Sequence, residues 1–458
     1  DMSDLCFSSI DSIAPRLQKR EVSPVELTQA YLDRIHAVDG DLHAYVNLME
    51  ESALAEARAA EQEILNGRYR GPLHGIPFAV KDQYDVRGAL SMVRIPQPAG
   101  PGEDCTAVRR LREAGAVLLG KLNMSGLPGG IEAARNPWNL DHVPGGSSTG
   151  SGASIAGGLC MGSLGEDTAG SIRNPASFCG ISGLKPTYGR VSRFGLAPLG
   201  LSLDTAGPMT RVVEDLAHML QVLAGFDPRD PTSSPVDVSD YSADLRAGVS
   251  GMVVGVPRDY FKLIDTDPEV LELFDQALAA LDSLGAKIRD VTVPSMEYAT
   301  IANGLIYSCE FYNICRADMD AAMSGEGSES RRARLFIGAV STSGDYIQAQ
   351  RMRSRLRREF NEVFREVHVM ALPTNPTPAP LAAELDGLDA VNKMLRPDYP
   401  SPANLAGVPA LAIPSGFNSK GLPVGMQFWG KAFAESTLLR VGYAYQQETR
   451  WFERRPAG

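Results

Sequence analysis

The 458-residue sequence is poor in cysteine, histidine and tryptophan, with six, six and three residues of these types. No two cysteines have CxxC spacing, and no group of cysteines and histidines has the spacing of a zinc site. Cysteines spread this thinly over a long chain indicate free thiols in a reducing compartment rather than a disulfide framework. We therefore expect neither a metal ion nor another cofactor.

Long apolar runs and an excess of positive charge are also missing. No run approaches the roughly 18 apolar residues that a membrane span needs, and the first residues lack the basic and apolar regions of a signal peptide. The formal net charge of −11 argues against binding to phosphate backbones or anionic membrane surfaces. These absences predict a cytoplasmic monomer or homodimer that acts on a small molecule, with no nucleic-acid or membrane partner.

Glycine, in contrast, is abundant and concentrated in one region. Of the 45 glycines, 15 lie between Gly145 and Gly207. Such a local excess indicates a backbone that bends tightly or approaches another group closely. Between Gly145 and Leu184 there is no lysine and a single arginine, Arg173. We therefore look for chemistry in this segment.

Helical patterns and short apolar runs alternate through the middle of the chain. The run 76–80, for example, is bounded by turn residues and reads as a buried strand, and 253–256 is similar. This alternation is typical of an α/β fold with helices on the faces of a sheet. We predict a single domain, 1–458, in four parts: N-terminal helices (1–66), a core (67–295), a helical side or cap (296–400), and a return to the sheet with a terminal helix (401–458).

Two short motifs match well-known patterns but lack their context. Gly115 to Lys121 fits the GxxxxGK phosphate loop, yet Leu122 follows where serine or threonine should bind magnesium, and its loop positions favour a strand. Gly146 to Gly150 fits the GxSxG nucleophile elbow, which requires a strand directly before it, whereas residues 137–144 read as a loop. We interpret both matches as structural.

The glycine-rich segment itself has two possible interpretations. The first is a tight crossing of helix and sheet that only small residues fit. The second is catalytic, because the turn from Thr168 to Ser171 could direct successive N–H groups at one oxyanion and present Ser171 as a nucleophile. No histidine lies in the segment, so the base would be a buried neutral lysine, and Lys81 directly follows the apolar run 76–80.

Several long motifs, in order along most of the chain, resemble those of the amidase signature family of serine hydrolases. They are Gly75-Ile76-Pro77 through Lys81-Asp82, Gly120-Lys121-Leu122-Asn123-Met124, Gly145 through Ser192, Asn404-Leu405-Ala406-Gly407-Val408-Pro409, and Gly421-Leu422-Pro423-Val424-Gly425. The resemblance implies a large mixed central β-sheet flanked by helices on both faces. It also implies hydrolysis of C–N bonds through an acyl-enzyme.

The resemblance further implies a Ser-cisSer-Lys triad. By position, Ser171 is the nucleophile, Ser147 is the bridging serine that follows a cis peptide bond, and Lys81 is the base. The implied oxyanion donors are the backbone N–H groups of Thr168, Ala169, Gly170 and Ser171.

Three departures from the family pattern bear on the substrate. Ala169 replaces a usual glycine, Thr149 replaces another, and a glycine-rich loop occupies 126–130. Gly129, Gly130 and Gln427 are the pocket candidates. Among small-molecule hydrolases of the family, which cleave simple amides or carbamates (urethanes), the 126–130 loop and Ala169 favour those that act on carbamates. Aryl amides and esters should react through the same attack. The alternatives are a glutamine-hydrolysing subunit of a tRNA-dependent amidotransferase and an inactive scaffold.

Overall fold

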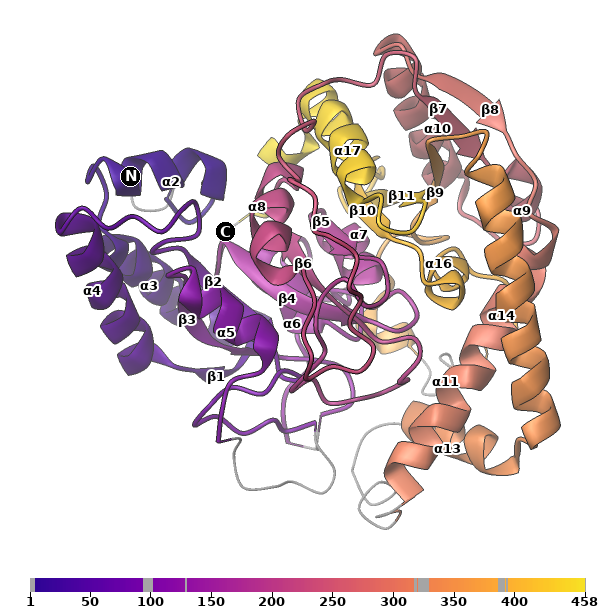
Figure 1. Ribbon diagram of the computed structural model, residues 1–458, viewed down its shortest axis with the longest axis horizontal. Coiled ribbons are helices and arrows are strands. Elements are labelled where there is room, and N and C mark those ends of the chain that lie inside the picture. Colours follow the sequence, from indigo (N-terminus) through magenta and orange to yellow (C-terminus); the bar gives the residue numbers. More distant parts are fainter. Residues whose placement is uncertain are drawn as a thin grey trace.

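A computed structural model describes residues 5–93, 102–127, 130–316, 319, 329–385, 392 and 394–457. At its centre lies an 11-stranded sheet with the order β1-β3-β2-β4-β6-β5-β10-β11-β9-β7-β8 (Figure 1). The strands are β1 (Tyr45–Leu48), β2 (Pro77–Lys81), β3 (Val117–Leu122), β4 (Gly162–Asp167), β5 (Ser182–Lys185), β6 (Thr205–Thr210), β7 (Val253–Val256), β8 (Lys287–Asp290), β9 (Val369–Pro373), β10 (Ala410–Phe417) and β11 (Pro423–Gly430).

Helices surround this sheet. They are α2 (Ile10–Gln18), α3 (Pro24–Leu42), α4 (Glu50–Leu65), α5 (Thr106–Glu113), α6 (Thr149–Ala156), α7 (Arg173–Cys179), α8 (Val213–Leu223), α9 (Arg258–Phe261), α10 (Pro268–Ser283), α11 (Ala299–Cys315), α13 (Glu329–Val340), α14 (Ser343–Val363), α16 (Ser401–Ala406) and α17 (Glu435–Thr449). None of those in the described part of the chain has both the length and the apolar character required to cross a bilayer.

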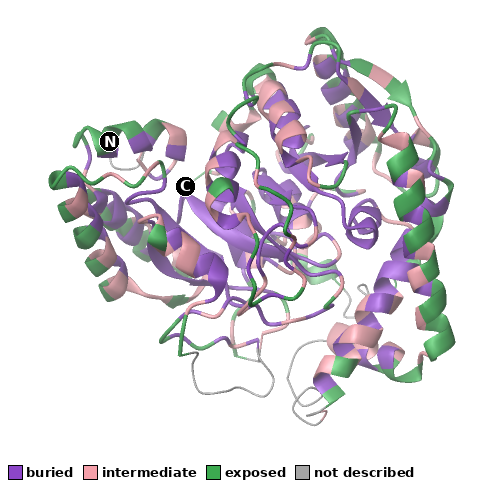
Figure 2. Ribbon diagram, viewed as in Figure 1, coloured by how far each residue is buried: buried purple, intermediate pink, exposed green. Residues whose placement is uncertain are grey.

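The sheet is mixed, as predicted. β2 runs parallel to both β3 and β4, whereas β6 is antiparallel to β4 and β5. Every residue of β2, β3, β4 and β6 is buried (Figure 2). Burial on both faces explains why β2 and β3 read as short, mostly apolar runs without alternation.

Helices cover both faces, as predicted. Leu411 of β10 lies against α17, because a Cβ added at Gly442 would meet its side chain. Gly425 of β11 faces Ser177 of α7 in the same way. Leu411 pairs with Phe428, so these two side chains lie on the same face of the sheet. Gly425 is three residues from Phe428 on β11 and therefore faces the opposite side. The two helices thus cover opposite sides of the sheet.

The segment after β8 is mainly helical, as the sequence indicates, and α11, α13 and α14 form an arm at the side of the sheet (Figure 1). The N-terminal region differs from its all-helical prediction, since β1 at Tyr45–Leu48 adds an edge strand antiparallel to β3. Four residues between two strong helices carry too little local signal, so pairing with β3 decides their conformation. The GxxxxGK match lies largely on β3, a fully buried strand, as we interpreted it.

Candidate active site

The parallel pairing of β2 with β4 creates the site. Val80 pairs with Leu164, so both strands end at the same edge of the sheet. Lys81 is the last residue of β2, and Glu166 and Asp167 are the last residues of β4. Because parallel strands present their carboxyl ends together, Lys81 and Glu166 meet although 85 positions separate them.

Ser147 reaches this edge from the loop before α6. Its Oγ accepts a hydrogen bond from Lys81 Nζ at 2.8 Å, and the peptide bond between Gly146 and Ser147 is cis. The backbone O of Ser147 accepts from the N–H of Ser125 at 3.0 Å. The neighbouring Ser148 donates its hydroxyl to the backbone O of Glu166 at 3.3 Å, which fastens the loop to β4.

Burial controls the charge on Lys81. The side chain is fully buried, and this desolvation lowers the pKa of Lys81, while the carboxyl groups of Glu166, Asp167 and Asp204 oppose the shift. The nearest carboxyl oxygen, Glu166 Oε2, lies 3.6 Å from Lys81 Nζ. A lysine with a lowered pKa is able to accept a proton, as a general base must.

Ser171 lies in the turn between β4 and α7, where it is half-buried. Among the described residues its hydroxyl has no hydrogen-bond partner, and the N–H groups of Ala169 and Ser171 have no acceptor. The structure differs from the prediction at Gly170, whose N–H donates to Asp167 Oδ1 at 2.7 Å. This donor is occupied because the tight turn brings it back over the carboxylate that precedes it.

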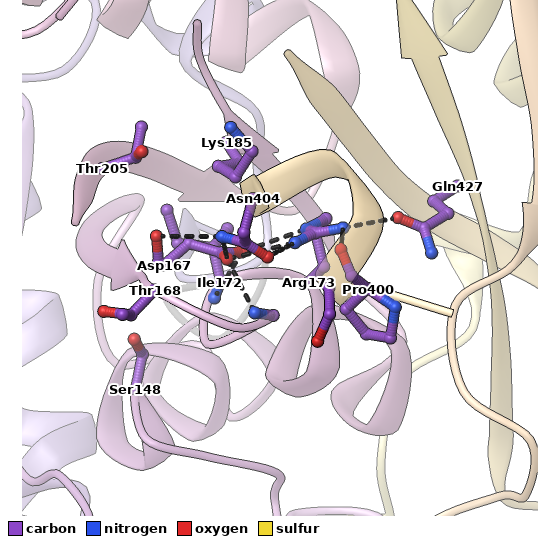
Figure 3. A network of polar contacts seen from close by, with 12 residues as sticks. Ser148, Asp167, Thr168, Ile172, Arg173, Lys185, Thr205, Pro400, Asn404 and Gln427 are labelled. Atoms are coloured by element: carbon purple, nitrogen blue, oxygen red, sulfur yellow. Dashed lines mark hydrogen bonds and ion pairs between the residues drawn. The ribbon is translucent and has the colours of Figure 1, made fainter. Parts of the chain in front are cut away.

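A buried ion pair supports this turn (Figure 3). Asp167 Oδ2 accepts hydrogen bonds from Arg173 Nε at 3.0 Å and from the N–H of Ile172 at 3.1 Å. Burial alone would raise the pKa of Asp167, but the Arg173 guanidinium holds it well below its usual range. Arg173 Nη2 also donates to Asn404 Oδ1 at 2.6 Å. The pair therefore connects the turn to α16.

Of the three residues predicted to line the substrate pocket, the two that the structure describes lie in different surroundings. Gln427 is fully buried: its Oε1 accepts from Arg173 Nη1 at 2.8 Å and from Trp429 Nε1 at 2.7 Å, and its Nε2 donates to two backbone oxygens. With its amide fully engaged, Gln427 does not present a polar group to a substrate, so this expectation is corrected. Gly130 lies in an exposed turn, and Gly129 lies outside the described residues.

The helical arm brings further side chains to the site that the sequence did not reveal. Asn303 of α11 donates to the backbone O of Thr168 at 3.2 Å. Tyr307, one turn later, lies near enough to Glu166 for that carboxyl to affect its pKa, which burial raises to about 12. The guanidinium of Arg334 on α13 stacks 3.7 Å from the centre of the Tyr307 ring. No local pattern marks these positions, because only the packing of α11 and α13 brings them here.

Comparison with known proteins places this geometry in a family. The family model described as Amidase matches residues 26–439. The chain belongs to the amidase signature family. The A subunit of glutamyl-tRNA(Gln) amidotransferase from Moorella thermoacetica is 41% identical, over 99% of each chain. This membership makes the chain an amidohydrolase that acts on C–N bonds.

Solved structures agree with this assignment. The A subunit of glutamyl-tRNA(Gln) amidotransferase from Thermotoga maritima is 32% identical, with a TM-score of 0.81 over 97% of this chain and 95% of that chain. Peptide amidase from Stenotrophomonas maltophilia is 31% identical, with a TM-score of 0.83 over 98% of each chain. The fold predicted from the amidase signature motifs is therefore confirmed.

The relatives correct the predicted partners. We expected a small-molecule substrate alone, with no nucleic acid. The amidase signature relatives above include subunits of an enzyme named for glutamyl-tRNA(Gln), so that expectation is wrong. That prediction rested on the net charge of −11, which does not report the family to which a chain belongs.

Proposed function

We propose that this amidase signature enzyme hydrolyses the side-chain amide of glutamine and releases ammonia, as the A subunit of a glutamyl-tRNA(Gln) amidotransferase. The observation that carries the proposal is the hydrogen bond from the fully buried Lys81, at the end of β2, to Ser147. Ser171 follows the neighbouring strand β4, and its hydroxyl has no hydrogen-bond partner among the described residues. Relatives with this name match the chain along 99% of its length. The same arrangement serves any carboxamide, so the choice of glutamine needs a further argument.

In the proposed mechanism Lys81 is neutral and removes the proton of Ser147 as Ser147 takes the proton of Ser171. Ser171 Oγ then attacks the amide carbon, and the N–H groups of Thr168, Ala169 and Ser171 are the proposed donors to the oxyanion. The proton returns through Ser147 to the leaving nitrogen, which departs as ammonia. Water attacks the acyl-enzyme by the same route and releases the acid.

The inference that the substrate carries a carboxylate rests on Arg334. Its Nη1 is buried with no hydrogen-bond partner, and no carboxylate among the described residues forms an ion pair with it. A buried guanidinium nitrogen without an acceptor is costly, and a carboxylate ligand would satisfy the group bidentately. Arg334 stacks on Tyr307, which lies near the carboxyl group of Glu166. We assign this position to the α-carboxylate of glutamine.

A second candidate function is hydrolysis of small amides or carbamates by the chain alone. The similarity to a peptide amidase along 98% of each chain supports it. Ala169 also favours a specialised substrate, since its half-buried methyl group lies beside the oxyanion turn.

A hydrolysis panel distinguishes the two functions. We expect the purified chain to release ammonia from glutamine and to act far more slowly on a matched anilide, carbamate and ester. A serine-directed sulfonyl fluoride should label Ser171 in the wild type and fail to label Ser171→Ala. Wild-type turnover by Ser171→Ala would overturn the catalytic assignment, whereas preference for the carbamate would overturn the glutamine assignment alone.

A further inference from the structure

Two buried carboxyl groups beside the proposed base share one hydroxyl group. Thr168 Oγ1 lies 2.6 Å from Glu166 Oε1 and 2.7 Å from Asp204 Oδ1, and all three residues are buried. A threonine hydroxyl has one proton to donate. Two hydrogen bonds of this length therefore require a second proton, and only a carboxyl group can supply it. One of the two acids is protonated in the folded protein.

The hydrogen bonds indicate which acid holds that proton. Asp204 accepts the N–H of Leu199 at Oδ2 and the N–H of Gly200 at Oδ1, both at 2.8 Å, which favours its ionised form. Glu166 Oε2 has no hydrogen-bond partner among the described residues. Burial raises the pKa of both acids, and for Glu166 the nearby Asp204 adds to this effect and brings the pKa to about 8. In the resting site the negative charge lies on Asp204 and the proton on Glu166.

We propose that Glu166, Thr168 and Asp204 form a proton relay that moves a negative charge next to Lys81 when Lys81 becomes protonated. The relay rests on the proposed function, which makes Lys81 the base. Glu166 is then a positioning residue. It does not touch the substrate, and it affects the reaction only through its charge next to Lys81.

The relay moves two protons and consumes none. When Lys81 accepts its proton from Ser147, the O–H bond of Glu166 breaks and its proton passes to Thr168 Oγ1. The original proton of Thr168 passes to Asp204 Oδ1. Glu166 is left as a carboxylate whose Oε2 lies 3.6 Å from the Lys81 ammonium. The transfers reverse when Lys81 returns its proton through Ser147 to the leaving nitrogen.

The other groups that face Glu166 do not compete for this role. Asp167 is held ionised by its own arginine partner, and Tyr84 and Tyr307 stay neutral because burial raises the pKa of each. Lys81 is the cation that acts on Glu166. A charge that appears on Glu166 therefore stabilises Lys81 above all.

The substitution Glu166→Gln tests the relay, because glutamine keeps the shape and the hydrogen bond to Thr168 but cannot ionise. We expect kcat to fall at least about tenfold with KM nearly unchanged, since protonated Lys81 loses its counterion. Without this counterion the pKa of Lys81 should fall. The acid limb of the profile of kcat/KM against pH, which reports that pKa, should therefore move to lower pH. A merely structural Glu166 would leave that limb where it is.

Two substitutions at Thr168 provide a matched pair. Thr168→Val removes the hydroxyl and should lose at least about tenfold in kcat, whereas Thr168→Ser keeps the hydroxyl and should lose clearly less. Both variants keep the backbone N–H that the mechanism uses. Equal rates for the two variants would overturn the relay.

A measurement independent of turnover detects the proton itself. Near neutral pH, the infrared difference spectrum of wild type minus Glu166→Gln should contain the C=O stretch of a carboxylic acid, and its absence would contradict the protonated Glu166. All variants are first tested for labelling of Ser171 by the sulfonyl fluoride. If wild type fails to label, the proposed function fails; if it labels but the relay variants behave as wild type, only the relay fails.

Discussion

Lys81 Nζ donates to Ser147 Oγ at 2.8 Å, although 66 positions separate the two residues. The contact depends on two independent features of the fold. One is the strand β2, which buries the lysine at its last position. The other is the loop before α6, which the N–H of Ser125 and the hydroxyl of Ser148 hold in place. The nitrogen and the oxygen between which the proposed proton transfer occurs therefore already lie at hydrogen-bonding distance.

Removing the base should abolish turnover. We expect Lys81→Ala to lower kcat by about 10²–10⁴, because no other side chain among the described residues hydrogen-bonds to Ser147 and could accept its proton. Steady-state kinetics on the preferred amide measures the loss, and thermal unfolding tests whether the fold is intact. Ser154→Ala is the control: Ser154 is a buried serine of α6 that donates to the backbone O of Ser151, so its loss should leave the rate near wild type.

Arg334 should determine recognition of a charged substrate. With Arg334→Gln we expect KM for glutamine to rise by at least about tenfold, because a charge-assisted hydrogen bond to its carboxylate is lost. Hydrolysis of a neutral amide such as an unsubstituted aliphatic carboxamide should change little. A parallel loss on both substrates would show that Arg334 supports the fold of the helical arm rather than the carboxylate.

The ion pair under the catalytic turn should be essential for stability. Asp167→Asn leaves Arg173 buried without its counterion and should reduce the free energy of unfolding by about 3–5 kcal/mol. Urea denaturation followed by circular dichroism measures this loss. Adding Arg173→Met to Asp167→Asn should recover part of it, since the uncompensated charge is then removed. A loss under about 1 kcal/mol would contradict the role of the pair.

Lys185 should make stability depend on pH. Burial lowers the pKa of Lys185 to about 7, and its Nζ donates only to the backbone O of Pro186 among the described residues. The unfolded chain binds this proton up to the ordinary value of 10.5. Burial of the charged lysine therefore lowers the free energy of unfolding by its full amount below about pH 7. This loss disappears as the pH rises towards 10.5.

Replacing this lysine with an apolar side chain of similar size removes that cost. We expect Lys185→Met to raise the free energy of unfolding at pH 7 by about 1–4 kcal/mol. Urea denaturation of both proteins between neutral and alkaline pH should show this advantage shrinking as the pH rises. An advantage independent of pH would mean that Lys185 does not titrate between the folded and unfolded states.

The methyl group of Ala169 should influence substrate choice. Ala169→Gly removes one methyl beside the oxyanion turn, and a difference of one such group is worth about 10–200-fold in a close-fitting pocket. We expect the ratio of kcat/KM for a bulky amide to that for a small one to rise. Thr149→Gly, the other departure from the family pattern, serves as the comparison. An unchanged ratio would place Ala169 away from the substrate.

Much of the fold could be predicted because its signals are local. The buried strand at 76–80, the helix that follows Ser23-Pro24 and the terminal helix each carry their pattern within a few residues, and each is present. β1 could not be predicted in this way, since its partner β3 lies more than 70 positions away. Gln427 was misjudged because its polarity is visible in the sequence but its four hydrogen-bond partners are not.

By itself, the sequence determined the α/β class and the family, and it predicted the residues of the triad, because these depend on local patterns and ordered motifs. Only the tertiary structure decided what surrounds Lys81. Glu166 comes from the neighbouring strand β4, while Asp204 comes from the segment before β6. Charges and hydrogen bonds act through space over a few ångströms, so their partners emerge only when strands and helices pack. The glycine-rich segment illustrates both contributions. Its composition indicated where the site lies, whereas its fold places the Glu166 carboxyl group next to Lys81.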